Sequence, residues 1–275
     1  MASGTCGRRE EVIVSVSDRD YEVEVVSRHT VPAPVAIVIP QHRTVDLTRL
    51  AVDAIRAFTP PALADIWVVD NASMMDGACE ALGVNLILNR TPVWRRWQRP
   101  EQVGSLANAV ALEIAVQVLG MDADAPEPEW MFAMHNDALP IKAGWLEWLA
   151  SKVYDVVGTK ASQRSGYPHS QGVLFGYDWL RYLGPGALLP NLPAYDVAEG
   201  PSRFATHWSA WGFTHSPERC RGRYCQVEAS WLKDEACEIS WDDAGDVFYV
   251  HFGGGSIDRR DVTGWIGRTR KAIGL

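Results

Sequence analysis

The pattern of apolar and polar positions changes abruptly near residue 35. Residues 12–16 (VIVSV) and 21–26 (YEVEVV) alternate between the two kinds of side chain, and the polar stretch 17–20 lies between them. This period of two predicts a β-hairpin. We interpret residues 1–34 as a β-hairpin extension of the main fold, closed by the breaker Val31-Pro32-Ala33-Pro34.

From residue 35 to about residue 150, apolar strands without alternation are separated by helical segments. The predicted strands cover residues 35–39, 66–69, 85–88 and 130–134. The predicted helices cover residues 46–58, 76–82 and 106–119, the last opened by Gly104 and Ser105. Strands that are apolar on both faces and alternate with helices indicate a parallel sheet covered on both sides. The predicted fold class is therefore α/β, with a Rossmann-like, mostly parallel sheet and helices on both faces.

Beyond residue 150 the pattern is less regular. It predicts strands at 153–157, 172–175 and 247–251, and a helix from residue 178. Residues 184–245 are rich in Pro, Gly, Trp and charge, and are expected to be irregular. We expect one domain over residues 35–275, with an ordered half (35–150), a less regular half (151–256) and a basic C-terminal tail (257–275).

Composition narrows the class of protein. A chain of 275 residues with 47% hydrophobic and 22% charged residues can bury a sizeable core, which excludes a largely disordered chain. The net charge of −8 argues against a nucleic-acid binder held by overall charge, although arginines gather in three segments. The polar start, the lack of an apolar run of roughly 20 residues and five scattered cysteines favour a cytoplasmic protein.

Polar groups follow three of the predicted strands. Pro40-Gln41-His42 ends the first strand, Asp70-Asn71 the second and His135-Asn136-Asp137 the fourth. Ligands of open parallel sheets bind at the carboxyl ends of the strands. A buried carboxylate must be satisfied by hydrogen bonds or by a ligand. Either acid alone is explained equally well as the cap of the next turn, whereas both together favour a binding site.

At this point the sequence resembles a known family. The segments VAIVIPQHRTVDLTRLAVDAIRAF, IWVVDNAS, GSLANAVAL and MFAMHNDALPIKAGWLEWL, in this order, resemble the family-2 glycosyltransferases of the GT-A fold. VFYVHFGGGS (247–256) resembles that family's late His-Gly-Gly segment, and QGVLFGYDWL (171–180) resembles its acceptor side more loosely. The resemblance implies an inverting enzyme that moves a sugar from a nucleotide-diphospho-sugar to an acceptor hydroxyl. Residues 35–150 would form its donor half and residues 151–256 its acceptor half.

The resemblance also implies roles for individual residues. Asp70 would accept hydrogen bonds from the nucleobase, and Gly104 would permit close approach of the nucleoside. Asp137 would bind a divalent cation, Mg²⁺ or Mn²⁺, that bridges the diphosphate, with His251 as a second metal or phosphate contact. The donor pocket as a whole would be formed by Pro40, Gln41, Asp70, Asn71, Gly104, Asn108 and Asn136.

Two departures from the family pattern bear on the metal and the phosphates. The first position of the acidic DXD-type motif is His135, so one carboxylate is missing and a cation would bind through Asp137 without it. The start of the predicted helix, from Gly104 to Asn108, lacks the Lys or Arg that often accompanies this segment in the family. The arginines that precede it could meet phosphate charge instead, or form a solvated loop: Arg90, Arg95, Arg96 and Arg99.

The general base expected of an inverting enzyme is an Asp or Glu near the acceptor hydroxyl. Asp196 is the first candidate and Glu199 the second, because both lie beside Tyr195 in the acceptor half. The same spacing also fits a capping box, with Asp196 as the cap of a helix and Glu199 at its third position. The weaker candidates are Asp234, Glu235, Asp242 and Asp243.

The acceptor is open. The resemblance implies a glycan, a lipid-linked sugar or a small metabolite. A hydroxymethylated base in DNA is an alternative, motivated by the arginine segments and by the aromatic residues around 94–97 and 207–231. A nucleotidyltransferase is disfavoured because residues 41–44 contain no glycine. A non-catalytic nucleotide-sugar binding module stays open because His135 departs from the motif.

Overall fold

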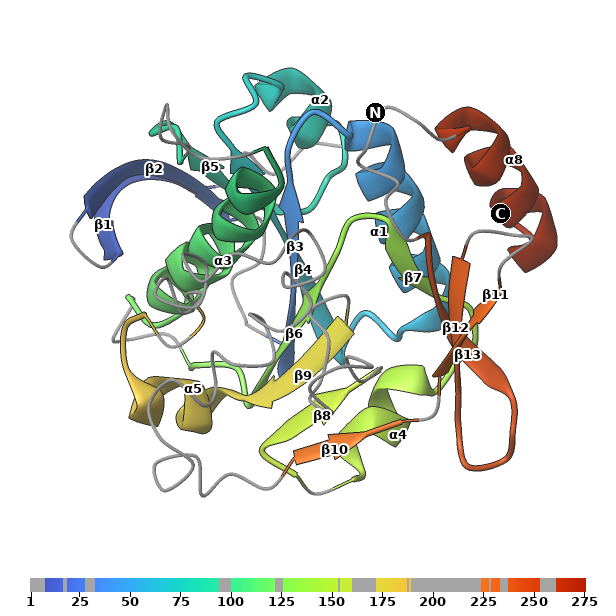
Figure 1. Ribbon diagram of the computed structural model, residues 1–275. Helices are drawn as coiled ribbons and strands as arrows, with labels where there is room; N and C mark the ends of the chain where they lie inside the picture. The colour runs from blue at the N-terminus through green and yellow to red at the C-terminus, as the bar shows by residue number, and fades with distance from the viewer. Residues whose placement is uncertain are drawn as a thin grey trace.

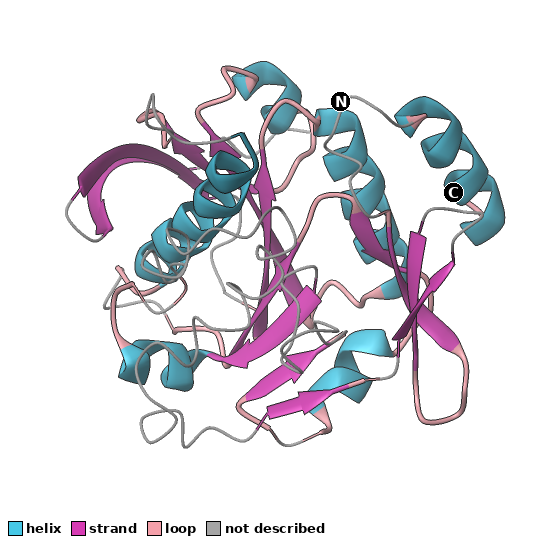
Figure 2. Cartoon of the chain, in the orientation of Figure 1, coloured by secondary structure: helices cyan, strands magenta, loops and turns pink. Residues whose placement is uncertain are grey.

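The computed structural model describes the chain in separate ranges. These ranges are 8–16, 19–27, 33–93, 100–121, 126–152, 154–159, 172–186, 188, 224–227, 229–232, 237–252 and 261–275. The described chain forms a large sheet between layers of helices and a smaller sheet beside it (Figure 1). Figure 2 separates the two kinds of element by colour.

The large sheet has nine strands in the order β1-β2-β5-β4-β3-β6-β9-β8-β10. The four central strands, β5, β4, β3 and β6, run parallel to one another, and the flanking strands β2 and β9 pair antiparallel with this centre. In chain order the strands are β1 (Arg8–Val16), β2 (Arg19–Ser27), β3 (Val35–Gln41), β4 (Ala64–Asn71), β5 (Asn85–Asn89), β6 (Trp130–Met134), β8 (Val156–Gly158), β9 (Gly172–Gly176) and β10 (Tyr224–Gln226).

Helices cover both faces of this sheet, as the lack of alternation in its central strands predicts. Successive side chains of a strand point to opposite faces. In β3, Val38 packs in the cluster that contains α3 (Pro100–Leu119), whereas Ile37 and Ile39 pack in the cluster on the other face. The helices of that second face are α1 (Val45–Phe58), α2 (Asp76–Glu80) and α4 (Trp145–Ala150). The predicted α/β class is confirmed.

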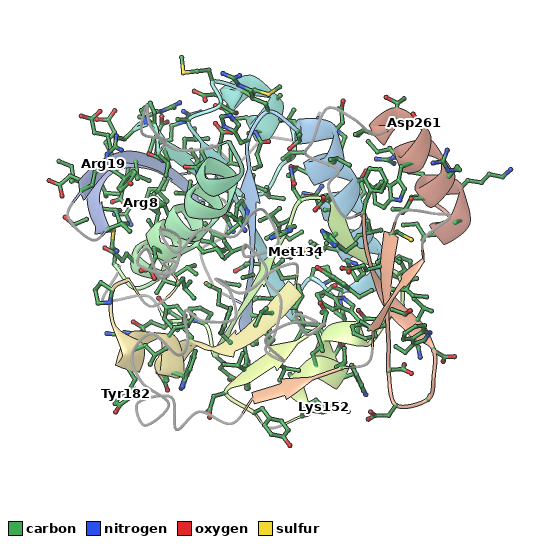
Figure 3. The ribbon with its side chains drawn as sticks, viewed as in Figure 1. Arg8, Arg19, Met134, Lys152, Tyr182 and Asp261 are labelled. Atoms are coloured by element: carbon green, nitrogen blue, oxygen red, sulfur yellow. The ribbon has the colours of Figure 1, made fainter. Side chains whose placement is uncertain are left out.

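The smaller sheet is antiparallel and joins segments far apart in the sequence. Its order is β11-β12-β13-β7, with β7 at Ala138–Pro140, β11 at Ala229–Leu232, β12 at Cys237–Trp241 and β13 at Val247–His251. Because β7 follows β6 after a three-residue turn, the chain passes from the large sheet into the small one there. Figure 3 labels Met134, the last residue of β6, near the centre of the view.

Two further helices complete the described chain. The helix α5 (Tyr177–Leu183) follows β9, and Tyr177 Oη donates to the Val116 carbonyl of α3 at 2.7 Å. The helix α8 (Val262–Ile273) lies beside α1 (Figure 1), where Arg270 pairs with Asp53. Within the described residues no helix combines the length and the apolar character needed to cross a membrane.

The predicted N-terminal hairpin is confirmed and is longer than the alternation indicated. The strands β1 and β2 pair in register from Arg8↔Ser27 to Val16↔Arg19, and β2 continues the large sheet by pairing with β5. The third helix starts earlier than expected, at Pro100, so Gly104 lies inside α3 and does not open it. Proline suits the first position of a helix because its missing N–H would have no partner there.

Two expectations for the second half of the chain, on the strand at 153–157 and on residues 184–245, are corrected. The strand expected at 153–157 is the shorter β8, Val156–Gly158. Residues 184–245, expected to be irregular, contain β10, β11 and β12. The expected basic tail contains α8, which Asp261 caps by accepting a hydrogen bond from Gly264 N at 2.8 Å. Short strands paired across the chain leave little periodicity, which is why the pattern missed them.

Candidate cation and nucleotide site

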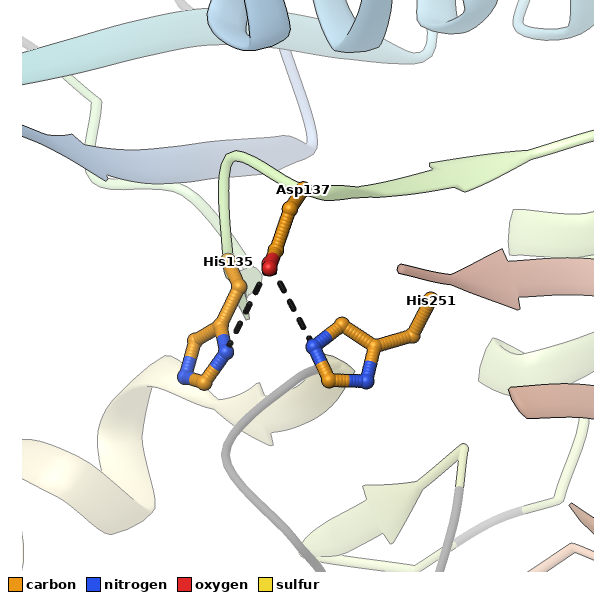
Figure 4. Close-up of side chains that lie close together, drawn as sticks. All are labelled: His135, Asp137 and His251. Atoms are coloured by element: carbon orange, nitrogen blue, oxygen red, sulfur yellow. Dashed lines mark ion pairs between the residues drawn. The ribbon is translucent and has the colours of Figure 1, made fainter. Parts of the chain in front are cut away.

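Two histidines and one aspartate gather where β6 ends and the small sheet begins. His135, Asp137 and His251 each offer one ligand atom, and these atoms lie within 4.8 Å of one another (Figure 4). Asp137 Oδ1 is 3.3 Å from His251 Nε2 and 3.9 Å from His135 Nδ1. Asp137 and His251 are buried, and His135 is partly exposed. A cluster with one accessible member is suited to a ligand that arrives from solvent.

The local fold explains how these residues meet. A tight turn after β6, with Ala138 N donating to the His135 carbonyl at 3.2 Å, places His135 and Asp137 on one loop. The strand β13 pairs antiparallel with β7, and His251 stands opposite Ala138. Phe252 N also donates to the Asp137 carbonyl at 2.8 Å. The ends of β7 and β13 therefore hold Asp137 and His251 side by side.

A buried carboxylate supports His251 from the other side of its ring. Glu238 on β12 is the register partner of His251 on β13. Its Oε2 lies 3.2 Å from His251 Nδ1, and both side chains are buried. The imidazole of His251 therefore has a carboxylate at each nitrogen: Glu238 at Nδ1 and Asp137 at Nε2.

The surroundings favour the neutral form of His135. Desolvation by the packed protein lowers the pKa of His135 to about 4, and the nearby Asp137 carboxylate opposes this only in part. The ring of His251, 5.5 Å away between centroids, acts in the same direction as desolvation. Neutral imidazole has a lone pair for a metal ion, so the side chain is in the right form for a ligand near pH 7.

The three side chains fit a divalent cation. Metal–ligand bonds of about 2.0–2.2 Å place neighbouring ligand atoms about 2.8–3.6 Å apart at ordinary coordination angles. The separation of 3.3 Å between Asp137 and His251 lies in this range, and that of 3.9 Å to His135 is slightly above it. The partly exposed His135 ring would have to approach Asp137 by a few tenths of an ångström to enter this range. Imidazole and carboxylate are both established ligands of divalent metals.

Asp70, the predicted nucleobase contact, is 1% exposed and its carboxylate already accepts hydrogen bonds from the protein. Gln41 Nε2 donates to Oδ1 at 2.7 Å, Ser73 Oγ donates to the same oxygen, and Ser73 N donates to Oδ2 at 3.2 Å. Because β3 and β4 are parallel neighbours with Gln41 opposite Asp70, this cluster lies at the carboxyl edge of the sheet, as expected. The role of Asp70 toward a nucleobase stays a prediction.

A chain of hydrogen bonds runs along this edge from Asp70 to the turn that carries the cation cluster. Gln41 donates to Asp70 with its amide nitrogen and accepts from Thr44 N with its amide oxygen at 3.0 Å. The Thr44 hydroxyl accepts in turn from Asn136 Nδ2. Asn136 lies between His135 and Asp137, so the ends of β4, β3 and β6 are joined by polar contacts. These hydrogen bonds therefore hold the ends of the three strands in place relative to one another.

The other residues predicted for the donor pocket are dispersed over the same edge and over α3. Asn71 donates to the Ala107 carbonyl of α3 at 2.6 Å and accepts from Asn89 at 2.8 Å. Pro40 is buried within β3, and Asn108 is half-buried on α3. Their role toward a nucleoside stays a prediction, as does that of Gly104.

The loops at this edge carry unusual backbone. Arg43, Ala72 and Met74 have φ values of 59°, 55° and 61°, in the left-handed region that non-glycine residues seldom adopt. His42 Nδ1 lies 3.0 Å from the Asn71 carbonyl and so ties the two loops together. Strained residues persist where the surrounding structure holds them, and they concentrate at functional sites. Their position beside the Asp70 network agrees with a binding role for this edge.

The sequence predicts Asp137 and His251 as metal contacts, and the structure adds two neighbours that it does not predict. In the sequence His135 stands only for a missing carboxylate, whereas in the structure its Nδ1 lies 3.9 Å from Asp137 Oδ1. Glu238 is not among the predicted site residues, because the pairing of β12 with β13 is not part of the sequence prediction. The alternation around the turn Asp242-Asp243-Ala244-Gly245-Asp246 was the signal for that hairpin. Asp196 and Glu199, the predicted bases, lie outside the described residues.

Comparison with known structures identifies the class of fold. The chain has the fold of the GT-A-type glycosyltransferases, as the sequence resemblance implies. The galactosyltransferase LgtC, solved in complex with donor and acceptor sugar analogs, matches with a TM-score of 0.51 and 12% identity over 87% of this chain and 95% of LgtC.

Two further structures align less extensively. The mannosyltransferase PcManGT from Pyrobaculum calidifontis, in complex with GDP-Man and Mn²⁺, has a TM-score of 0.44 and 19% identity over 72% of this chain. Glucosyl-3-phosphoglycerate synthase from Mycobacterium tuberculosis has a TM-score of 0.41 and 13% identity over 60% of this chain. The aligned parts span 55% and 66% of those two proteins. No family model and no curated protein sequence matches the chain.

Proposed function

We propose that the protein is a glycosyltransferase that moves a sugar from a nucleotide-diphospho-sugar to an acceptor hydroxyl, with a divalent cation at the diphosphate. The observation that carries the proposal is the cluster of His135, Asp137 and His251 at the carboxyl edge of a GT-A-type sheet. Its position agrees with the rule that open α/β sheets bind ligands at this edge. The galactosyltransferase LgtC, which was solved with donor and acceptor sugar analogs, supports the same class of reaction.

Two groups of residues at the carboxyl edge would have different roles in binding the sugar donor. Asp137 and the two histidines would hold the cation, which would supply positive charge to the diphosphate leaving group. The Asp70–Gln41–Thr44–Asn136 network would keep the nucleoside end and the diphosphate end in fixed relation. Such fixed placement lowers the entropic cost of reaching a reactive geometry.

The finer points of the proposal concern stereochemistry and the acceptor. We propose a single displacement with inversion at the anomeric carbon, with Asp196 or Glu199 taking the proton from the acceptor hydroxyl. The acceptor would be a glycan, a lipid-linked sugar or a small metabolite. Proton NMR of the first-formed product tests the stereochemistry, because an inverted product from an α-linked donor shows a β-anomeric signal. A retained α-signal contradicts the inverting step alone.

Nucleotide binding tests the donor claim directly. The melting temperature of the protein is measured with UDP, GDP and TDP, each with and without Mn²⁺. At least one of the three is expected to raise it, and only with the cation. Asp137→Asn is expected to abolish the increase, whereas Asp178→Asn, at an exposed position on α5, leaves it intact. No increase with any nucleotide would overturn the donor claim.

Release of sugar from the donor separates an enzyme from a binding module. Each nucleotide sugar is incubated with the protein and Mn²⁺, and the free nucleotide is measured by chromatography. Slow hydrolysis without an acceptor is expected, and Asp137→Asn removes it. Binding without any turnover, with and without candidate acceptors, contradicts the enzyme claim and leaves the non-catalytic alternative.

A further inference from the structure

The cation cluster contains more nitrogen than an acidic DXD-type motif provides. We propose that His135 is itself a metal ligand, that Glu238 positions His251, and that the resulting site selects a transition-metal cation such as Mn²⁺, Co²⁺ or Zn²⁺ against Mg²⁺. The proposal deepens the proposed function, on which it rests for the purpose of the site. Its test is nevertheless independent of donor binding, because cation coordination is measured on the protein alone.

The geometry around Asp137 supports His135 as a ligand. Its Nδ1 faces Asp137 Oδ1 at 3.9 Å, and its ring lies edge-on to that of His251, with centroids 5.5 Å apart (Figure 4). Both imidazoles therefore lie around the same carboxylate oxygen. His135 occupies the sequence position where a carboxylate was expected, so an imidazole takes the place of an oxygen ligand.

The contacts of His251 support Glu238 as a positioning residue. A histidine that binds a metal through one nitrogen usually donates its other N–H to a carboxylate or carbonyl, which fixes the tautomer and the ring orientation. Glu238 Oε2 lies 3.2 Å from His251 Nδ1, and the β12–β13 register holds the two residues opposite each other. With Nδ1–H donated to Glu238, the Nε2 lone pair is directed to the side where Asp137 lies.

The kinds of ligand atom decide which cation the site prefers. Mg²⁺ is a hard cation that favours oxygen ligands and gives up its water reluctantly. Imidazole suits the first-row transition metals, and affinities at nitrogen-containing sites rise along the series from Mn²⁺ to Cu²⁺ and are lower again for Zn²⁺. Two imidazoles and one carboxylate therefore favour a transition metal, whereas a site of carboxylates would admit Mg²⁺ more readily.

Electron paramagnetic resonance of bound Mn²⁺ tests the ligand assignment. Hyperfine coupling to ¹⁴N, resolved by electron spin echo modulation, reports coordinated imidazoles without any need for catalysis. The wild-type protein is expected to show two coupled nitrogens, and His135→Ala one. His42→Ala, in the neighbouring loop, is the matched control and keeps both. Two coupled nitrogens in His135→Ala, or none in the wild type, would overturn the assignment of His135.

Competition between cations tests the selectivity. The free Mn²⁺ signal is followed while Mg²⁺ is added, and displacement from the wild type is expected to need at least about a 100-fold excess. His135→Asp restores an oxygen ligand, so Mg²⁺ is expected to displace Mn²⁺ at about tenfold lower excess. Equal competition in both proteins, or Mg²⁺ binding to the wild type as tightly as Mn²⁺, contradicts the selectivity.

The variants of Glu238 test the positioning role. Loss of a supporting carboxylate typically weakens metal affinity about 10–100-fold. Glu238→Ala is expected to show that loss, and Glu238→Gln a smaller one, because the amide oxygen still accepts from Nδ1–H. The melting temperatures of the metal-free variants show whether the weaker Mn²⁺ binding results from lost positioning of His251 or from a general loss of stability. Unchanged Mn²⁺ affinity in a folded Glu238→Ala protein overturns the role.

The outcome for the cation and the outcome for the sugar donor are separable. Two nitrogen couplings together with no nucleotide-dependent stabilisation would support the cation site and reject the proposed function. Nucleotide-dependent stabilisation with unchanged couplings in His135→Ala would do the reverse.

Discussion

Replacing Asp70 with alanine would show how strongly the carboxyl edge depends on its own hydrogen bonds. The side chain is 1% exposed and accepts from Gln41 Nε2 at 2.7 Å, from Ser73 Oγ and from Ser73 N at 3.2 Å. Hydrogen bonds to a charged group contribute about 1.5–3 kcal/mol each, and buried donors left without an acceptor cost about 1–3 kcal/mol each. Because Gln41 Nε2 retains Ser73 Oγ at 3.2 Å and water can enter the vacated space, we expect a loss of about 3–5 kcal/mol.

Urea unfolding at 25 °C, followed by tryptophan fluorescence, measures this loss as a lower midpoint at unchanged slope. The control is Asp178→Ala, an exposed acid in the first turn of α5, for which a change of less than about 1 kcal/mol is expected. A loss below about 1 kcal/mol for Asp70→Ala would show that its carboxylate is not held as the contacts indicate. In that case its acceptor capacity would be available to a ligand.

Three further predictions concern positions away from this edge. Gly172→Ala is expected to lower the free energy of unfolding by about 1–3 kcal/mol, since the new Cβ would lie 2.8 Å from Tyr249 Oη. Gly267→Ala, on the exposed side of α8, is expected to raise it by about 0.5–1 kcal/mol. Urea midpoints that move in the same direction for both variants would refute this contrast. Trp265→Ala is expected to cost about 3–5 kcal/mol because the ring is 5% exposed. A circular-dichroism melt unchanged from wild type contradicts this. Desolvation raises the pKa of Glu113, so the ionised form is disfavoured in the folded state and wild-type stability falls relative to Glu113→Gln as pH rises above the ordinary Glu pKa. Parallel stability curves between pH 4 and pH 7 refute that sign.

Elements whose residues are apolar on both faces were predictable, because burial on two sides leaves a continuous apolar run. The strand β6 matches its prediction at both ends, and β3 differs by two residues. Elements that depend on distant partners were not predictable. The strand β7 has three residues and exists through its pairing with β13, and no local pattern marks so short a segment.

The candidate site was predictable in part for the same reason. The pattern places Asp137 at a strand end, and the resemblance to the family's late segment points to His251. The approach of His135 to Asp137 depends on the direction of a side chain in a turn, which residue type alone does not give. The contact of Glu238 with His251 depends on the register of β12 and β13, including a shift near Ser240 and Trp241. Register is set by pairing and turn geometry together.

The junction between β6 and β7 implies that a bound cation would affect the stability of the protein as well as its chemistry. Asp137 follows a strand of the large sheet, and His251 belongs to the small one, so an ion held by both would cross-link the two sheets. A ligand that binds only the folded state stabilises it by mass action, by about 2.7 kcal/mol at 100 times its dissociation constant. A sample treated with chelator would then melt at a lower temperature than a loaded one and lose its small sheet to protease sooner. The stability of a purified sample would therefore depend on how much metal it contains.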